Sequence, residues 1–175
     1  MADYPAELVR TRYLFDGSEV QIRPIRADDK TMEQDFVQHL SPDSRYRRFM
    51  STLKELAPGK LKYLTEIDYV KHLALVAIIE RDGEQIEIGV ARYVAGPSGT
   101  DCEFAIAIDD EWQGSGVAGI LMLTLIDAAR ARGMQRMEAF ILSTNDKMIK
   151  FARQLGFAVH RDSDDPGMVV AERGL

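Results

Sequence analysis

The sequence predicts an α/β domain of the α+β type, with a central, mostly antiparallel mixed sheet flanked by helices. Three strand-like segments follow one another between residues 73 and 108 with only turn sequences between them. After residue 116 helical segments alternate with further strands, so both element types share one core. The chain has 175 residues, which fits a single domain over 1–175.

Composition and charge exclude several classes of function. The 22 Lys and Arg residues against 28 Asp and Glu residues give a net charge of −6, whereas nucleic-acid binding needs basic surfaces. One cysteine and scattered histidines predict no metal site. The sequence has neither an apolar run that could cross a membrane nor a secretory start, so we expect a cytoplasmic protein without membrane contact.

The first elements follow from local signals. Residues 20–23 alternate in polarity before Pro24, which predicts a strand. The acidic start at 27–29 predicts a helix to about residue 39, because acidic side chains stabilise the first helical turn. Ser41 and Pro42 then suit the cap and first position of a second helix, over 42–49. A third helical turn is expected near 60–64.

The central segments predict a three-stranded antiparallel meander. Residues 73–79 form a nearly continuous apolar run, typical of a strand that is covered on both faces. Turn sequences at 81–84 and 96–99 lead into strands over 86–91 and 102–108.

Alternating helices and strands complete the chain. Glycines end the helices predicted over 116–132 and 146–155, with a strand over 137–142 between them. Two closing strands follow.

The loop between strand 102–108 and helix 116–132 is the most informative segment. Gly114 and Gly116 allow phosphate oxygens to approach the backbone, and the first amides of a helix have no internal partner. These features predict a diphosphate site at the amides of 114–118. The same glycines also suit a tight turn that lets the helix pack closely.

Two other phosphate-binding patterns compete for this loop. Gly114-x-Gly116-x-x-Gly119 spells a dinucleotide fingerprint, and Glu138 stands about 20 residues on, where a ribose-binding acid is sought. That fingerprint normally follows its strand directly, and here acidic residues intervene. A kinase-type loop fails because no Gly-Lys-Ser/Thr follows.

The pattern Gln113-x-x-Gly116-x-Ala118 resembles the acetyl-CoA-binding signature of the GCN5-related N-acetyltransferase (GNAT) superfamily, and the resemblance extends over about residues 18–172. It implies the GNAT fold, with a sheet that is splayed at the acetyl-CoA site. Acetyl-CoA is then the co-substrate, held by a strand backbone and by the loop. The cofactor-binding residues so implied are Ile106, Ile108, Gln113, Gly114, Ser115, Gly116, Val117, Ala118 and Asn145.

Four stretches, 22–26, 40–46, 65–69 and 102–105, resemble the acetyltransferase domain of bacterial protein-lysine acetyltransferases. The resemblance implies an amine acceptor, with a protein lysine as the expected one, and it puts Asp68 and Tyr69 in the acceptor site. A small amine such as a polyamine, drug or metabolite, or a silent acyl-CoA-binding module, stays open. The oligomeric state is not predicted.

Glu103 is the candidate general base. A lysine ammonium with a pKa near ~10.4 must lose a proton before it can attack. Strand alternation puts Ala105 and Ala107 on the same side as Glu103, which leaves room for a thioester. Apolar surroundings should raise the pKa of Glu103 and make it a better base. A glutamate that simply reaches solvent is the alternative.

The remaining candidates have simpler interpretations. Cys102 should face away from Glu103 as a buried thiol rather than act as a nucleophile. Many GNAT relatives use a tyrosine in the helix after Asn145 as an acid, but Ala152 stands there, next to Phe151. Protonation of the thiolate by water or another group is therefore implied. The basic run 45–48 could contact an acidic partner, and a solvated helix face is its simpler interpretation.

Overall fold

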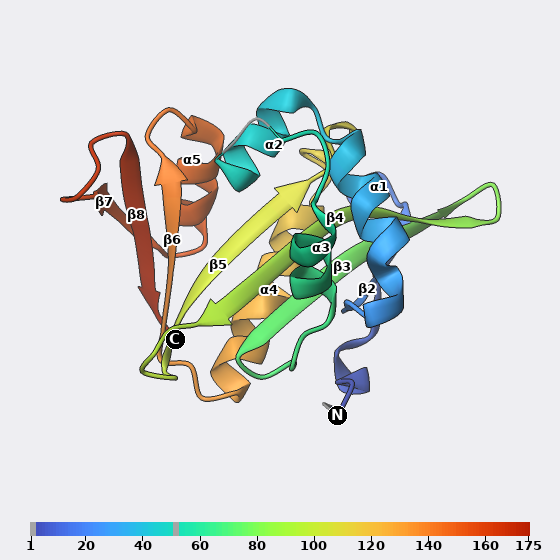
Figure 1. The fold of residues 1–175 in the computed structure, drawn as a ribbon, viewed down its shortest axis with the longest axis horizontal. Helices are drawn as coiled ribbons and strands as arrows, with labels where there is room; N and C mark the ends of the chain where they lie inside the picture. Colours follow the sequence, from blue (N-terminus) through green and yellow to red (C-terminus); the bar gives the residue numbers. More distant parts are fainter. Residues whose placement is uncertain (1–2, 51–52) are drawn as a thin grey trace.

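The computed structural model describes residues 3–50 and 53–175, which form one sheet with helices on both faces (Figure 1). The sheet has eight strands among these residues, in the order β1-β2-β3-β4-β5-β6-β8-β7. Every neighbouring pair is antiparallel except β5 and β6, which are parallel. The predicted fold class is confirmed.

The strands are β1 (Arg10–Tyr13), β2 (Glu19–Pro24), β3 (His72–Arg81), β4 (Glu84–Ala95), β5 (Asp101–Ile108), β6 (Arg136–Leu142), β7 (Ala158–Arg161) and β8 (Met168–Gly174). The helices are α1 (Lys30–His39), α2 (Pro42–Phe49), α3 (Pro58–Thr65), α4 (Val117–Ala131) and α5 (Asp146–Gln154), with 3-10 turns η1 (Ala6–Leu8), η2 (Ala27–Asp29) and η3 (Asp110–Trp112). No helix in the described ranges has both the length and the apolar character that a membrane crossing needs.

Every predicted strand and helix is present, and one strand was not predicted. The helix expected from residue 27 begins as the 3-10 turn η2 and continues as α1. The missed strand is β1, whose residues are all exposed. Because β1 buries neither face, its sequence carries no apolar alternation that could have revealed it.

The two faces of the sheet belong to two separate apolar clusters. Ala74, Val76 and Ile78 of β3 pack with residues of α1 and α3. The alternate residues, such as Leu73 and Leu75, pack with α4 instead. In Figure 1, α1 and α3 lie in front of the sheet and α4 behind it. Burial on both faces explains the continuous apolar sequence of β3.

The sheet opens between β5 and β6. Their parallel pairing is limited to Asp101 with Arg136, Cys102 with Met137 and Glu103 with Glu138. Beyond these pairs the strands diverge (Figure 1), because β5 stays paired with β4 while β6 stays paired with β8. The predicted splay is therefore present, and it begins at Glu103.

A buried charge network lies between the sheet and the helices α1 and α3. Arg92 of β4 lies 3.6 Å from the Glu33 carboxylate and donates from Nη1 to the Leu64 carbonyl and to His72 Nε2, both at 3.0 Å. Because arginine only donates, His72 must accept at Nε2 in its neutral form. Burial and the Arg92 charge lower the pKa of His72 to about 4. Burial and the nearby Glu33 raise the pKa of Glu87.

Candidate active site

A cavity of about 750 Å³ occupies the opening between β5 and β6. Its volume is within the usual range for small-molecule sites, about 300–1,000 Å³. Glu103, Ala105 and Ala107 line it from the face that α1 and α3 cover, and Phe104 and Ile106 line it from the other face. The cavity therefore passes through the thickness of the sheet.

The structure brings most of the predicted cofactor residues to this cavity. The predicted residues that line it are Glu103, Ile106, Ile108, Gln113, Gly114, Gly116, Ala118 and Asn145. Ser115 and Val117 do not line it. Val117 is buried in the core, and its amide donates to the Ser115 hydroxyl at 3.4 Å, so the two residues support the shape of the loop.

Backbone groups of β5 border the cavity where β6 has diverged. The Asp101 carbonyl and the Asp109 amide bond toward β4, at 2.7 and 2.8 Å. Backbone groups alternate along an antiparallel ladder, so those of Ile106 and Ile108 point the other way, into the opening. The Gln113 amide donates to the Ile108 carbonyl at 3.4 Å. An extended ligand arm laid beside β5 finds these groups available for hydrogen bonds.

The loop and the start of α4 have the features of an anion site. Gly114 and Gly116 have φ values of +78° and +96°, a region that favours glycine. The first amides of α4 have no partner within the helix, and Ala118 and Gly119 at that end line the cavity. The positive end of α4 therefore meets the cavity, which suits a phosphate group.

Phe15 is a cavity residue that the sequence did not reveal. It lies in the connection between β1 and β2, is 87% exposed, and its amide donates to the Ser115 carbonyl at 3.1 Å. A Cβ added to Gly116 would meet the Phe15 ring at 3.0 Å. A residue larger than glycine at position 116 would therefore displace the Phe15 ring and also strain the backbone.

Glu103 faces the cavity between charges of both signs. Partial burial and the nearby Glu138 raise its pKa, while Arg48 of α2 lowers it. The net direction is upward, as expected from its small neighbours Ala105 and Ala107. A glutamate with a raised pKa is a stronger base than an ordinary carboxylate once it has ionised.

Helix α2 forms the wall across from β5. Ser44, Arg47, Arg48 and Met50 line the cavity from this side. Tyr46 and Arg47 are exposed, as expected of a solvated helix face, and Arg47 and Arg48 in addition line the cavity. Their spacing alone could not distinguish the two cases, because the packing of distant segments decides what a short helix faces.

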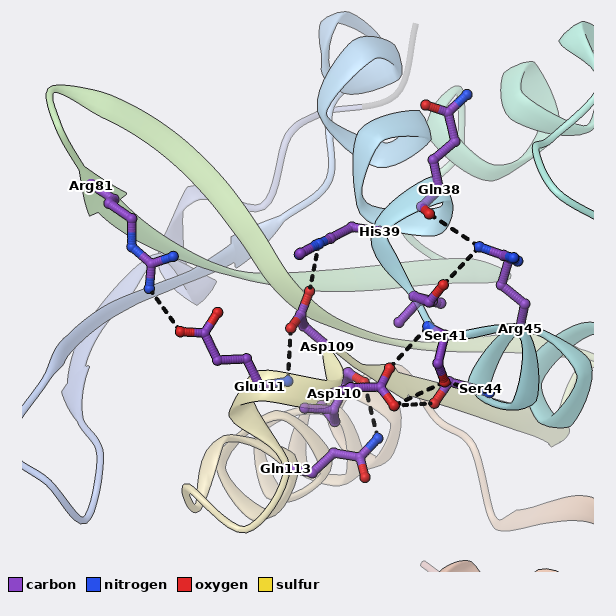
Figure 2. Close-up of polar contacts among 12 residues, drawn as sticks. Gln38, His39, Ser41, Ser44, Arg45, Arg81, Asp109, Asp110, Glu111 and Gln113 are labelled. Carbon is purple, nitrogen blue, oxygen red and sulfur yellow. Dashed lines mark hydrogen bonds and ion pairs between the residues drawn. The ribbon is translucent and has the colours of Figure 1, made fainter.

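Asp110 joins α2 to the beginning of the loop that connects β5 to α4, called the phosphate loop below (Figure 2). Its carboxylate accepts hydrogen bonds from the Ser41 amide at 3.1 Å, the Ser41 hydroxyl at 2.9 Å and the Ser44 hydroxyl at 3.0 Å. Burial raises the pKa of Asp110, but these hydrogen bonds outweigh it and lower the pKa. Arg45 adds bonds to the carbonyls of Gln38 and Leu40, at 3.0 and 2.7 Å (Figure 2). Since α2 has no fully buried residue, these polar contacts hold its position.

Asp68 and Tyr69 are not among the residues that line the cavity. The Asp68 carboxylate accepts from the amides of Val70, Lys71 and His72, all at 2.8–2.9 Å. The Tyr69 hydroxyl donates to the Ile25 carbonyl at 2.8 Å. These contacts fix the segment that leads into β3, and a role in the acceptor site stays a prediction.

The other candidates have structural positions. Cys102 is buried on the α4 side of β5, and burial raises its pKa to about 12, which makes it a poor nucleophile. Phe151 lines the cavity, Ala152 is buried, and none of the described lining residues is a tyrosine. Trp112 lines the cavity and packs against the α4 core cluster. The described residues hold no group of metal-binding side chains.

Comparison with known proteins matches this chain to one family. Residues 34–157 match the acetyltransferase (GNAT) family. An acetyltransferase from Pseudomonas aeruginosa is 40% identical over 162 residues, which cover 93% of this chain and 87% of that protein. Acetyltransferase Pat from Mycolicibacterium smegmatis is 33% identical over 89% of this chain but only 46% of its own length. The GNAT domain of S. lividans PAT has a TM-score of 0.90 at 31% identity, covering 99% of this chain and 100% of that domain.

Proposed function

The chain belongs to the GNAT acetyltransferase family, and from this premise we propose that it transfers the acetyl group of acetyl-CoA to a protein lysine, with Glu103 as general base. The observation that carries the proposal is the cavity through the sheet. It has an anion-binding helix end at α4 and a carboxylate of raised pKa on the face that α1 and α3 cover. A diphosphate thioester and an amine can then meet from opposite faces.

The residues present fit acetyl-CoA, which supplies the activated acetyl group. The amides of Gly114, Gly116 and Ala118, whose residues line the cavity, and the Gln113 side chain hold the diphosphate. The backbone groups of Ile106 and Ile108 hold the pantetheine arm in the opening beside β5. Asn145, which caps α5 through a bond from the Met148 amide at 3.3 Å, completes the wall on the β6 side.

Glu103 takes one proton from the lysine ammonium, directly or through a water molecule. The freed Nζ lone pair forms a bond to the thioester carbonyl carbon, the nitrogen then releases its second proton to water, and the carbon–sulfur bond breaks to release the CoA thiolate. The thiolate then takes a proton from water, since the described lining residues include no tyrosine. A thiol pKa of about 8.5 makes a dedicated acid helpful rather than essential.

A lysine acceptor is supported by three further observations. Four separate stretches resemble protein-lysine acetyltransferases, and the cavity is open to solvent rather than enclosed. The net charge of −6 also attracts lysine-rich surfaces, over a screened range of about 8 Å at physiological salt.

Replacing Glu103 tests both parts of the proposal. We expect Glu103→Gln to bind acetyl-CoA like the parent protein in calorimetry and to lose roughly 10²–10⁴-fold in turnover, a loss that shrinks as pH rises. Incubation of each protein with acetyl-CoA and a lysate, followed by mass spectrometry of acetyl-lysine, should show selected sites with the parent only.

Three results would contradict the proposal. An unchanged rate in Glu103→Gln near neutral pH would remove the base role. Diffuse acetylation equal in both proteins, together with rapid turnover of a small amine, would exclude the lysine acceptor. Binding of acetyl-CoA without transfer to any amine would favour a silent binding module.

A further inference from the structure

We infer that Arg48 selects acceptor lysines that have an acidic residue close to them in the protein chain, an inference that rests on the proposed lysine acceptor. Arg48 and Glu103 line the same cavity from two elements, α2 and β5. Glu103 shares its face of β5 with Ala105 and Ala107, the face that packs against α1 and α3. Arg48 is therefore a cation beside the carboxylate that the lysine ammonium must approach.

Arg48 differs from the two fully buried arginines of the sheet, Arg23 and Arg92, in having no carboxylate partner. Arg23 pairs with Asp29 at 2.7 Å, and Arg92 lies 3.6 Å from Glu33. Within residues 3–50 and 53–175, half-buried Arg48 makes no ion pair and no hydrogen bond. A cation that is partly removed from water without a partner is costly, and an anion supplied by a ligand offsets that cost.

The orientation of the guanidinium suits a carboxylate. Its central carbon lies 4.7 Å from the centroid of the Phe49 ring. Contact with an aromatic ring occupies a face of the planar group, whereas the N–H donors lie in its plane and stay available. Such donors bind a carboxylate with two parallel hydrogen bonds.

The fixed position of α2 makes the contact between Arg48 and an acidic residue of the acceptor specific. The bonds from Ser41 and Ser44 to Asp110 fix α2 before any ligand arrives, so little ordering is needed on binding. The proposed diphosphate site lies at the start of α4, a helix that packs on the face of the sheet opposite to the one that Glu103 shares with Ala107. A lysine with a neighbouring Asp or Glu therefore complements the site in charge. Its ammonium is opposite in sign to Glu103, and the neighbouring carboxylate is opposite in sign to Arg48.

Paired peptides provide the test. Each pair carries the same acceptor lysine, with Glu or with Gln at the positions next to it. We expect the parent protein to acetylate the Glu peptide with a kcat/KM about tenfold higher, as for a charge-assisted hydrogen bond. Arg48→Met should reduce this ratio to about one. Arg47→Met is the matched control and should keep the ratio, because Arg47 pairs with Asp43 at 3.3 Å.

The ratio separates this role from other effects of the substitution. Any change in the basicity of Glu103 alters both peptides equally and cancels, so a ratio that persists in Arg48→Met would overturn the inference. A parent protein without preference for Glu would do the same.

Arg48→Met should bind acetyl-CoA with unchanged affinity in calorimetry. Weaker binding would assign the guanidinium to the cofactor instead. Turnover of small amines alone, with no peptide modified, would overturn the lysine acceptor and this inference with it.

Discussion

At the residue scale, Glu103 lies where a cation and an anion oppose each other. Partial burial, and then Glu138 of the neighbouring strand, raise its pKa, and Arg48 of α2 lowers it. Strand alternation was enough to predict Glu103 as a candidate, because it depends only on the local chain. Arg48 and Phe15 could not be predicted as cavity residues, because the contacts of α2 with β5, and of the β1–β2 connection with the loop, join distant parts of the sequence.

These opposing charges predict opposite shifts in the pH profile. Glu103 acts as a base only when ionised, so kcat/KM should fall as the pH drops through its raised pKa, above the ordinary 4.5. Glu138→Gln removes a neighbouring negative charge and should move this acidic limb to lower pH. Arg48→Met removes a positive charge and should move it to higher pH. Profiles that shift in the same direction, or not at all, would show that another group controls the limb.

At the element scale, the phosphate loop was the part of the site that local sequence described best. Its glycines and the helix that follows are short-range features, and both have the predicted conformation. The additional contact of Gly116 with Phe15 was not predictable, because β1 carries no strand signal of its own. An acidic substitution at Gly116 would repel the diphosphate, but it would in addition strain the backbone and displace the Phe15 ring.

Ala118→Asp is the cleaner test of the loop. Ala118 lies in the first turn of α4 and lines the cavity, so the new carboxylate would face the diphosphate without requiring a positive φ. An acidic residue in a first helical turn favours the helix itself, so the fold should be retained. We expect affinity for acetyl-CoA to fall at least tenfold by like-charge repulsion, measured by calorimetry. Unchanged affinity in the folded variant would place the diphosphate elsewhere, and Ala118→Ser is the uncharged control.

At the scale of the whole molecule, the meander β3-β4-β5 followed from turn sequences between adjacent strands, and the structure confirms it. The insertion of β8 between β6 and β7 did not follow, because strand order beyond neighbouring hairpins depends on long-range packing. The same long-range packing assembles the buried network around Arg92, whose members come from α1, α3, β3 and β4.

This network predicts how stability depends on pH. Folded His72 has a pKa of about 4, whereas the unfolded chain binds a proton there near 6.5. The stability contributed by neutral His72 is therefore fully present above pH 6.5 and is lost as the pH falls toward 4, by about 3 kcal/mol in all. His72→Gln keeps an acceptor for Arg92 but cannot titrate. Its unfolding free energy, from urea titrations, should decline less steeply over this window, and an equal decline would exclude His72 as the source.

The opening between β5 and β6 has cavity-lining residues on both faces of the sheet. For the proposed reaction, the acyl donor and the acceptor can then lie on different faces and need not exchange places. Both can be bound at once, and the kinetics should be those of a ternary complex rather than of a relay through an acetylated enzyme. The buried, weakly acidic Cys102 agrees with this, since it offers no nucleophile for such a relay. A compound that joins the two substrates covalently would contact both faces of the sheet and should bind more tightly than either substrate alone.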